Sequence, residues 1–76
     1  MKLDIEKEKL ATEISKIFPE WRGRNFSIWR EGKEQSFFVY FGKRSVRSKG
    51  VKLNAQQLRL LERYTEICVS LDEAGQ

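Results

Sequence analysis

The chain contains no histidine and only one cysteine, Cys68. An internal disulfide needs two cysteines, and an ordinary zinc site needs several histidine or cysteine ligands, so neither is expected. Histidine is also the commonest general acid or base, and a cysteine nucleophile normally has a base beside it. Catalysis by carboxylates alone stays open, but the acids lie mostly in the flanks, residues 4–20 and 62–73, where they alternate with lysine and arginine as on solvated helices. We therefore predict a non-catalytic protein with no metal and no other cofactor.

Long apolar runs are also missing. No stretch approaches the roughly 20 apolar residues of a membrane span, and the N-terminal sequence MKLDIEKEKL lacks the apolar core of a signal peptide. We expect no membrane association and a cytoplasmic location, with the nucleoid, or the nucleus of a eukaryote, as the alternatives.

The length of 76 residues leaves room for one domain, residues 1–76, with a thin hydrophobic core. Domains of this size often gain stability from disulfides, from a metal or from a second subunit. Since the composition argues against the first two, we predict a homodimer.

Positive charge is concentrated in the middle of the chain. The net charge is +4 overall, yet residues 1–19 are neutral, residues 20–52 carry +6 and residues 53–76 carry −2. Seven of the nine aromatic residues lie in the same middle segment. Single-stranded nucleic acids need cations for their phosphates and aromatic faces for their unstacked bases, so this segment is typical of a binding surface for them. The alternative is that the aromatic side chains form the core and the charges are merely solvated.

The apolar periodicity predicts two helices and a sheet between them. Apolar residues at steps of three and four predict an amphipathic helix over residues 4–18, with Asp4 as N-cap and Pro19 ending it. Alternation over residues 24–31 and 35–42 predicts a hairpin that turns at residues 31–33.

The rest of the chain is a basic loop, a short strand and a second helix. Residues 43–50 are polar and basic, and residues 51–53 suit a short strand, so that the sheet region spans residues 24–53. Asn54 with Gln57 forms a capping box for a helix over residues 54–72. The predicted fold class is α+β: a small antiparallel sheet followed by a long C-terminal helix, with an additional N-terminal helix.

Successive side chains of a β-strand point to opposite faces of the sheet, which separates the apolar residues of the hairpin into two sets. Phe26, Ile28, Phe37, Val39 and Phe41 face the core in this interpretation, and the opposite face carries Trp29, Phe38 and Tyr40. The N-terminal helix needs a surface to cover, and that aromatic face is one candidate.

The C-terminal helix has a wide apolar face, which indicates either packing against the N-terminal helix or contact with a partner chain. For the second alternative we assign the dimer interface to Leu58, Leu61, Tyr64 and Cys68.

The sequence KGVKLNAQQLRLL, residues 49–61, resembles the boundary between the last strand and the long helix of the PC4 family, the p15 transcriptional coactivators with their bacterial and phage relatives. The order of the preceding elements is also similar, over roughly residues 24–71. The resemblance implies a curved sheet, a dimer held mainly by the helices, and binding of single-stranded DNA along the sheets with little sequence preference. It matches Trp29 and either Tyr40 or Phe41 to stacking aromatics, and Arg47 and Lys49 to basic positions. The family often has tryptophan where this chain has Leu58, and its loop is longer than residues 41–49.

We therefore expect binding of single-stranded nucleic acid, DNA rather than RNA, in transcription, replication or recombination. One alternative is a small adaptor or inhibitor that binds another protein through the aromatic face, and another is a β-ribbon inserted into duplex DNA. The candidate nucleic-acid-binding residues are Arg24, Trp29, Phe38, Tyr40, Lys43, Arg44, Arg47 and Lys49.

Overall fold

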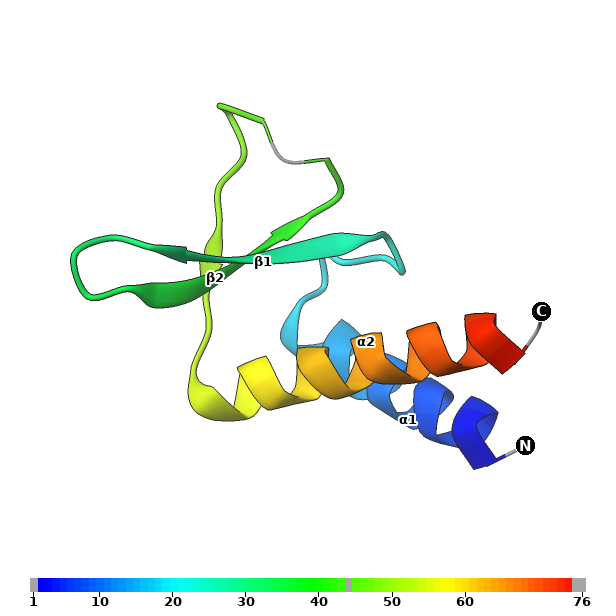
Figure 1. The fold of residues 1–76 in the computed structure, drawn as a ribbon. Coiled ribbons are helices and arrows are strands. Elements are labelled where there is room, and N and C mark those ends of the chain that lie inside the picture. Colours follow the sequence, from blue (N-terminus) through cyan, green and yellow to red (C-terminus); the bar gives the residue numbers. More distant parts are fainter. Residues whose placement is uncertain (1, 44, 75–76) are drawn as a thin grey trace.

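The computed structural model describes residues 2–43 and 45–74 and has the predicted α+β class. Helix α1 (Lys2–Ile17) leads into the hairpin of β1 (Phe26–Glu31) and β2 (Ser36–Phe41). Strand β3 (Val51–Lys52) and helix α2 (Ala55–Ala74) follow. The two helices lie side by side on one side of the sheet, and the segment between β2 and β3 projects from the other side (Figure 1).

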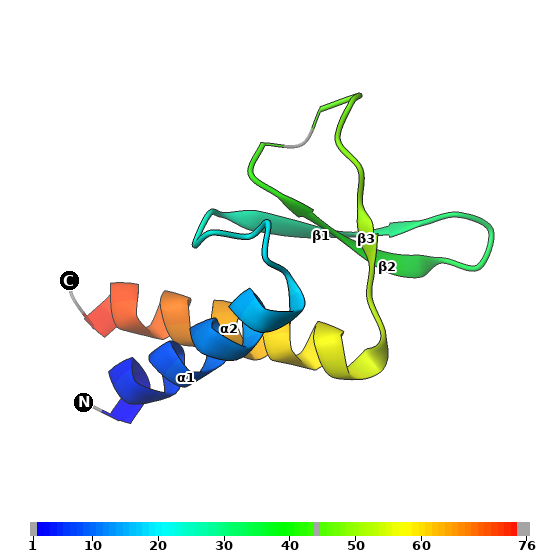
Figure 2. The same ribbon diagram turned by 180° about the vertical axis from the view of Figure 1, so that it is seen from behind.

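The three strands form one antiparallel sheet in the order β1-β2-β3. Phe26 pairs with Phe41, Trp29 with Phe38, and Phe38 in turn with Lys52. Seen from behind, β3 crosses the hairpin and leads directly into α2 (Figure 2). We call the side of the sheet toward the helices the inner face and the opposite side the outer face. The inner face carries Phe26, Ile28, Arg30, Phe37, Val39, Phe41 and Val51, and the outer face carries Ser27, Trp29, Glu31, Ser36, Phe38, Tyr40 and Lys52.

The core lies between the helices and the inner face. Its buried side chains come from both helices, from the sheet and from the segments that follow α1 and β3: Ile14, Phe18, Trp21, Val39, Leu53 and Leu61. The ring of Phe18 packs against Phe41 at 5.4 Å between centroids. Trp21 meets Tyr64 edge to face, also at 5.4 Å. Helix α1 therefore belongs to the same layer as α2 and leaves the outer face of the sheet uncovered by helices.

The helix ends follow local capping chemistry, with one correction. The Asn54 side chain accepts a hydrogen bond from the Gln57 amide at 2.8 Å, and the Gln57 side chain accepts one from the Asn54 amide at 2.9 Å. This confirms the predicted capping box. Asp4, however, is not the N-cap, because α1 begins at Lys2 and Asp4 lies in its first turn. A carboxylate in that turn is favourable beside the positive end of the helix dipole.

The hairpin loop is longer than predicted and occupies residues 32–35. Both its first and last residues have positive φ, 80° at Gly32 and 55° at Gln35. The Gln35 amide donates to the Gly32 carbonyl at 3.2 Å and closes the turn. The sequence signal at Gly32 located the turn but did not show that Glu34 and Gln35 belong to it.

The assignment of α2 residues to a dimer interface needs correction at Leu61. Its side chain is 0% exposed within a single chain, so it has no surface to offer to a partner. Leu58 and Tyr64 also pack against the core cluster, and Cys68 is half-buried. Burial, followed by the neighbouring Cys68, raises the pKa of the Tyr64 phenol. The wide apolar face of α2 is therefore used largely by α1 and the sheet.

Candidate nucleic-acid interface

One row of side chains crosses the outer face of all three strands. Trp29 of β1 is paired with Phe38 of β2, which is paired with Lys52 of β3. Trp29 is 45% exposed, Phe38 is half-buried and Lys52 is exposed. The indole nitrogen of Trp29 donates to the hydroxyl of Ser27 at 2.9 Å, which helps to orient the ring. The row thus combines an accessible aromatic platform with a cation on one surface.

Tyr40 lies on the predicted face, but its ring is not accessible. The side chain is only 8% exposed, because the chain returning toward β3 passes over it at Gly50. A Cβ at Gly50 would lie 2.7 Å from Cζ of the tyrosine ring, closer than real contacts allow. The tyrosine hydroxyl donates to the carboxylate of Glu31. The assignment of Tyr40 as a stacking residue is therefore wrong: strand parity gave its face correctly but could not show that the loop covers it.

The basic loop, residues 43–50, is held by a turn between two serines. The Ser48 amide donates to the Ser45 carbonyl at 3.0 Å, and the Ser45 amide donates to the Ser48 hydroxyl at 2.8 Å. Lys43, Arg47 and Lys49 are all exposed around this turn. The remaining candidate of the loop, Arg44, lies outside the described residues.

A depression separates the turn of the basic loop from the outer face of the sheet. It is lined by Glu31, Tyr40, Ser45, Val46 and Ser48. Val46 at the tip is fully exposed. Glu31 places an acid beside the turn of the basic loop, so the interface carries both signs of charge at this end of the sheet.

Arg24 has a structural role next to this surface. Its guanidinium donates to the carbonyl of Glu20 at 2.6 Å and to that of Trp21 at 3.3 Å. The Trp21 indole returns a hydrogen bond of 2.7 Å to the Arg24 carbonyl. The guanidinium also lies close to Gly42, where the basic loop begins. Arg24 therefore adds charge near the loop while its donors hold the segment between α1 and β1.

Sequence reasoning omitted Lys52 from the candidate site, although the signal was present. Val51 faces inward beside Val39, so alternation places Lys52 on the outer face next to Phe38. The candidate interface therefore consists of the row Trp29, Phe38 and Lys52 together with the exposed cations Lys43, Arg47 and Lys49.

Comparison of the chain with protein-family models, with curated proteins and with solved structures gives no match. The resemblance to the PC4 family thus stays a prediction. Over residues 2–43 and 45–74, no three histidine, cysteine or carboxylate side chains gather where they could hold a metal ion. Neither of the two helices in that part of the chain is both long and apolar enough to cross a membrane.

Proposed function

We propose that the chain binds single-stranded nucleic acid with little sequence preference, and DNA rather than RNA, through the outer face of the sheet and the basic loop. The observation that carries this proposal is the row of Trp29, Phe38 and Lys52 on the one face that neither helix covers. An unstacked base has a flat apolar surface, and stacking on an aromatic side chain contributes about 1 to 3 kcal/mol per base.

The cations lie where they could contact the phosphates of a nucleic acid whose base stacks on Trp29. Lys52 stands in the same row as Trp29, and Arg47 and Lys49 are exposed on the loop that rises from the same face. Figure 1 shows this loop projecting from the side of the sheet that faces away from the helices. Phosphates held by these side chains release counterions, which makes the affinity dependent on salt but not on sequence.

Single strands are favoured over duplexes because of Trp29. Bases in a duplex are already stacked on one another, so the indole ring finds a partner only where a base is unpaired. The cations alone would bind the phosphates of either form. The ratio of the affinities for single-stranded and duplex DNA therefore measures how much the aromatic row contributes to binding.

The test is a titration of one labelled sequence as single-stranded DNA, as duplex DNA and as RNA, repeated at several salt concentrations. Contacts with about five phosphates give a log-log salt slope of roughly −3.5 for a single strand. Tighter binding of the single strand than of the duplex supports the proposal. Equal affinity for the two forms at the same salt would refute it.

This role is non-catalytic and agrees with the PC4-like resemblance, which suggests a place in transcription, replication or recombination. Binding of another protein through the same face is the second candidate. It is favoured by the fully exposed Val46 at the tip of the basic loop, because an exposed apolar side chain is better suited to a protein partner than to phosphates. A complex held by apolar contacts responds weakly to salt, whereas strand binding weakens steeply.

A further inference from the structure

Strand β1 leaves one edge of the sheet without a neighbouring strand in the described part of the chain. The Gly42 amide donates to the Asn25 carbonyl at 2.7 Å, which makes these two residues a hydrogen-bonded pair at the end of the β1–β2 ladder. Because such pairs alternate along antiparallel strands, Ser27, Trp29 and Glu31 also direct their backbone groups toward β2. The backbone groups of Phe26, Ile28 and Arg30 then point to the open edge.

A groove of about 390 Å³ runs beneath this edge, between β1 and α2. Its lining consists of the inner-face side chains Phe26 and Ile28 and of Glu62, Thr65 and Glu66 on α2. The groove is therefore apolar on the side of the sheet and acidic on the side of the helix.

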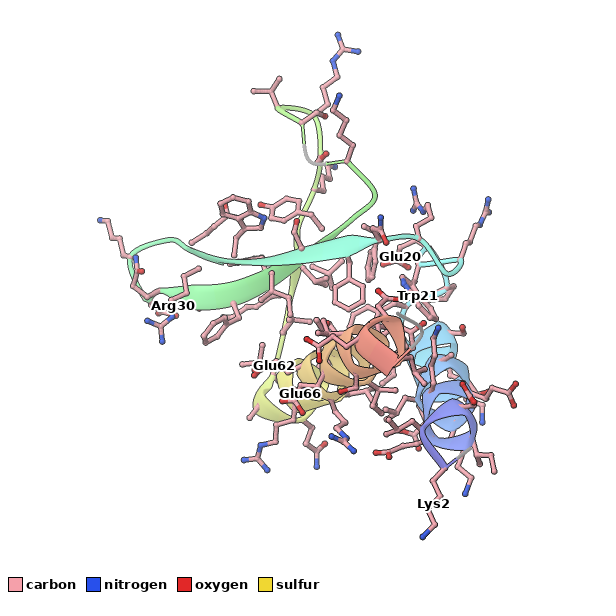
Figure 3. The ribbon with its side chains drawn as sticks, turned by 45° about the vertical axis from the view of Figure 1, so that its right-hand side comes forward. Lys2, Glu20, Trp21, Arg30, Glu62 and Glu66 are labelled. Atoms are coloured by element: carbon pink, nitrogen blue, oxygen red, sulfur yellow. The ribbon has the colours of Figure 1, made fainter. Side chains whose placement is uncertain are left out.

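Arg30 is the charged residue of the inner face of β1. Its guanidinium lies over the ring of Phe37, 4.8 Å from the centroid, and it stands near the end of the hairpin. Figure 3 shows Arg30 on the hairpin and both Glu62 and Glu66 on the side of α2 below it. Arg30 lies four residue steps along the strand from Phe26, about 13 Å at the usual rise, so the arginine and the groove occupy different parts of one edge.

We propose that the open edge of β1 pairs with the same edge of a second copy of this chain, antiparallel and around a two-fold axis at Ile28. In this register Ile28 lies opposite its own copy and Phe26 lies opposite Arg30 of the other chain. All three residues of each strand whose backbone groups point to the open edge are then paired, in about six backbone hydrogen bonds. Registers shifted by two residues leave one of them without a partner.

Charge complementarity is the reason for choosing a second copy as the occupant. The register places Arg30 of one chain over the groove of the other, where Glu62 provides one carboxylate and Glu66 a second that also accepts a hydrogen bond from Arg63 at 3.3 Å. The symmetry repeats this contact, so two arginines meet two acidic grooves. Apolar contact of Ile28 with its counterpart joins the two inner faces.

Pairing in this register also enlarges the candidate nucleic-acid interface. On the outer face, Ser27 of one chain lies opposite Trp29 of the other, so the two tryptophans become diagonal neighbours at about 7 to 8 Å. The two outer faces form one continuous surface with two aromatic platforms. The pairing itself does not depend on the proposed function.

A competing role for Arg30 makes the opposite prediction. A charged residue on the inner face of an edge strand is one of the features that protect natural sheets from pairing with other chains. If Arg30 acts only in this way, the protein is a monomer.

The first test is the mass of the full chain by light scattering in the absence of nucleic acid. The proposal predicts about 18 kDa, twice the 9.0 kDa of one chain. A folded monomer at every concentration up to the solubility limit would overturn it. Because the sample contains no nucleic acid, the measured mass does not depend on whether the chain binds nucleic acid.

The second test locates the interface by charge reversal. Arg30→Glu and Glu62→Arg should each weaken the dimer about tenfold or more, because the two-fold axis makes each change act twice. The double variant should recover most of the lost affinity. Arg59→Glu, the same change at an exposed position of α2 outside the groove, is the matched control and should have no effect. A dimer insensitive to both reversals, or a double variant weaker than either single one, would place the interface elsewhere.

A third test uses the paired positions directly. Opposite residues of a hydrogen-bonded pair have Cα atoms about 5.5 Å apart, within the range that a disulfide spans. With Cys68 changed to serine, Ile28→Cys should form an interchain disulfide on mild oxidation. Ser36→Cys, on the outer face of β2, should not. Crosslinking of both variants to the same extent, or of neither, would contradict the register.

Discussion

Neighbouring residues of β2 meet opposite surroundings on the two faces of the sheet. Val39 is 0% exposed among core side chains from α1 and α2, whereas Phe38 beside it lies between Trp29 and Lys52 on the outer face. The inner face is closed by two helices, and the outer face only by the basic loop, which at Gly50 lies over the Tyr40 ring and close to Cβ of Phe38. The difference teaches that aromatic content alone does not define a binding surface, because only aromatic side chains that stay exposed, as Trp29 does at 45%, remain accessible to a ligand.

The largest difference between the two faces should appear in stability. Leu61→Ala removes a fully buried side chain beneath the inner face and should lower the free energy of unfolding by about 2 to 5 kcal/mol. Val69→Ala, at a side chain of α2 that is 50% exposed, is the control and should change it by less than about 0.5 kcal/mol. Urea denaturation measures both. Similar values for the two variants would mean that α2 does not pack as described.

The covered part of the outer face should behave like the core. Gly50→Ala places a methyl group against the Tyr40 ring and should cost about 1 to 3 kcal/mol of stability. Combining it with Tyr40→Leu should relieve part of this cost, so the two changes should be strongly non-additive in a double-mutant cycle. Simple additivity would show that the loop does not lie on the tyrosine.

The uncovered part of the outer face should respond in binding instead. Trp29→Ala should weaken strand binding by about 1 to 3 kcal/mol and leave the unfolding midpoint nearly unchanged. Fluorescence anisotropy with a labelled strand, read beside a thermal melt, measures both effects. Loss of the fold without a specific loss of affinity would assign Trp29 to the structure rather than to the interface.

The basic loop should contribute charge without sequence selectivity. Arg47→Ala and Lys49→Ala should weaken binding of all sequences alike and make the salt slope shallower by roughly 0.7 for each lost phosphate contact. Arg59→Ala on α2 is the matched control, since it removes an exposed cation from the other layer of the molecule. An equal effect of Arg59→Ala would indicate that net charge, not the loop, drives binding.

The smallest effect belongs to an ion pair between the helices, far from the outer face. Glu6 accepts hydrogen bonds from Arg63 at 2.9 and 3.1 Å, and these lower the pKa of the Glu6 carboxyl. A lowered pKa in the folded state means that the pair stabilises the fold above the usual carboxyl range and stops doing so as the pH falls through the lowered pKa. Glu6→Gln should therefore slightly flatten the acid limb of a stability-versus-pH curve and leave strand affinity unchanged. A change in affinity would connect the helical layer to the interface.

Periodicity and capping chemistry were enough to predict the order of elements, because they are local properties of the chain. The alternation of strand residues predicts that Trp29 and Phe38 lie on the same face of the sheet, and the register confirms this. Tyr40 was misassigned because its cover comes from Gly50, ten residues later, and that contact has no local signal. The role of Arg24 depends on carbonyls that are placed only by the folded segment after α1. The position of α1 was also open, since its apolar stripe fits either face of the sheet.

The most direct measurement of the central claim uses the two tryptophans, which lie in opposite surroundings. Trp21 is buried in the core, and Trp29 is exposed on the outer face. If bases stack on Trp29, saturation with single-stranded DNA should quench the emission of the exposed tryptophan in the wild-type protein. The variant Trp29→Phe, which keeps an aromatic ring, should still bind the strand but show almost no quenching. Quenching that persists in Trp29→Phe, or a saturated wild-type complex with unchanged emission, would contradict the account.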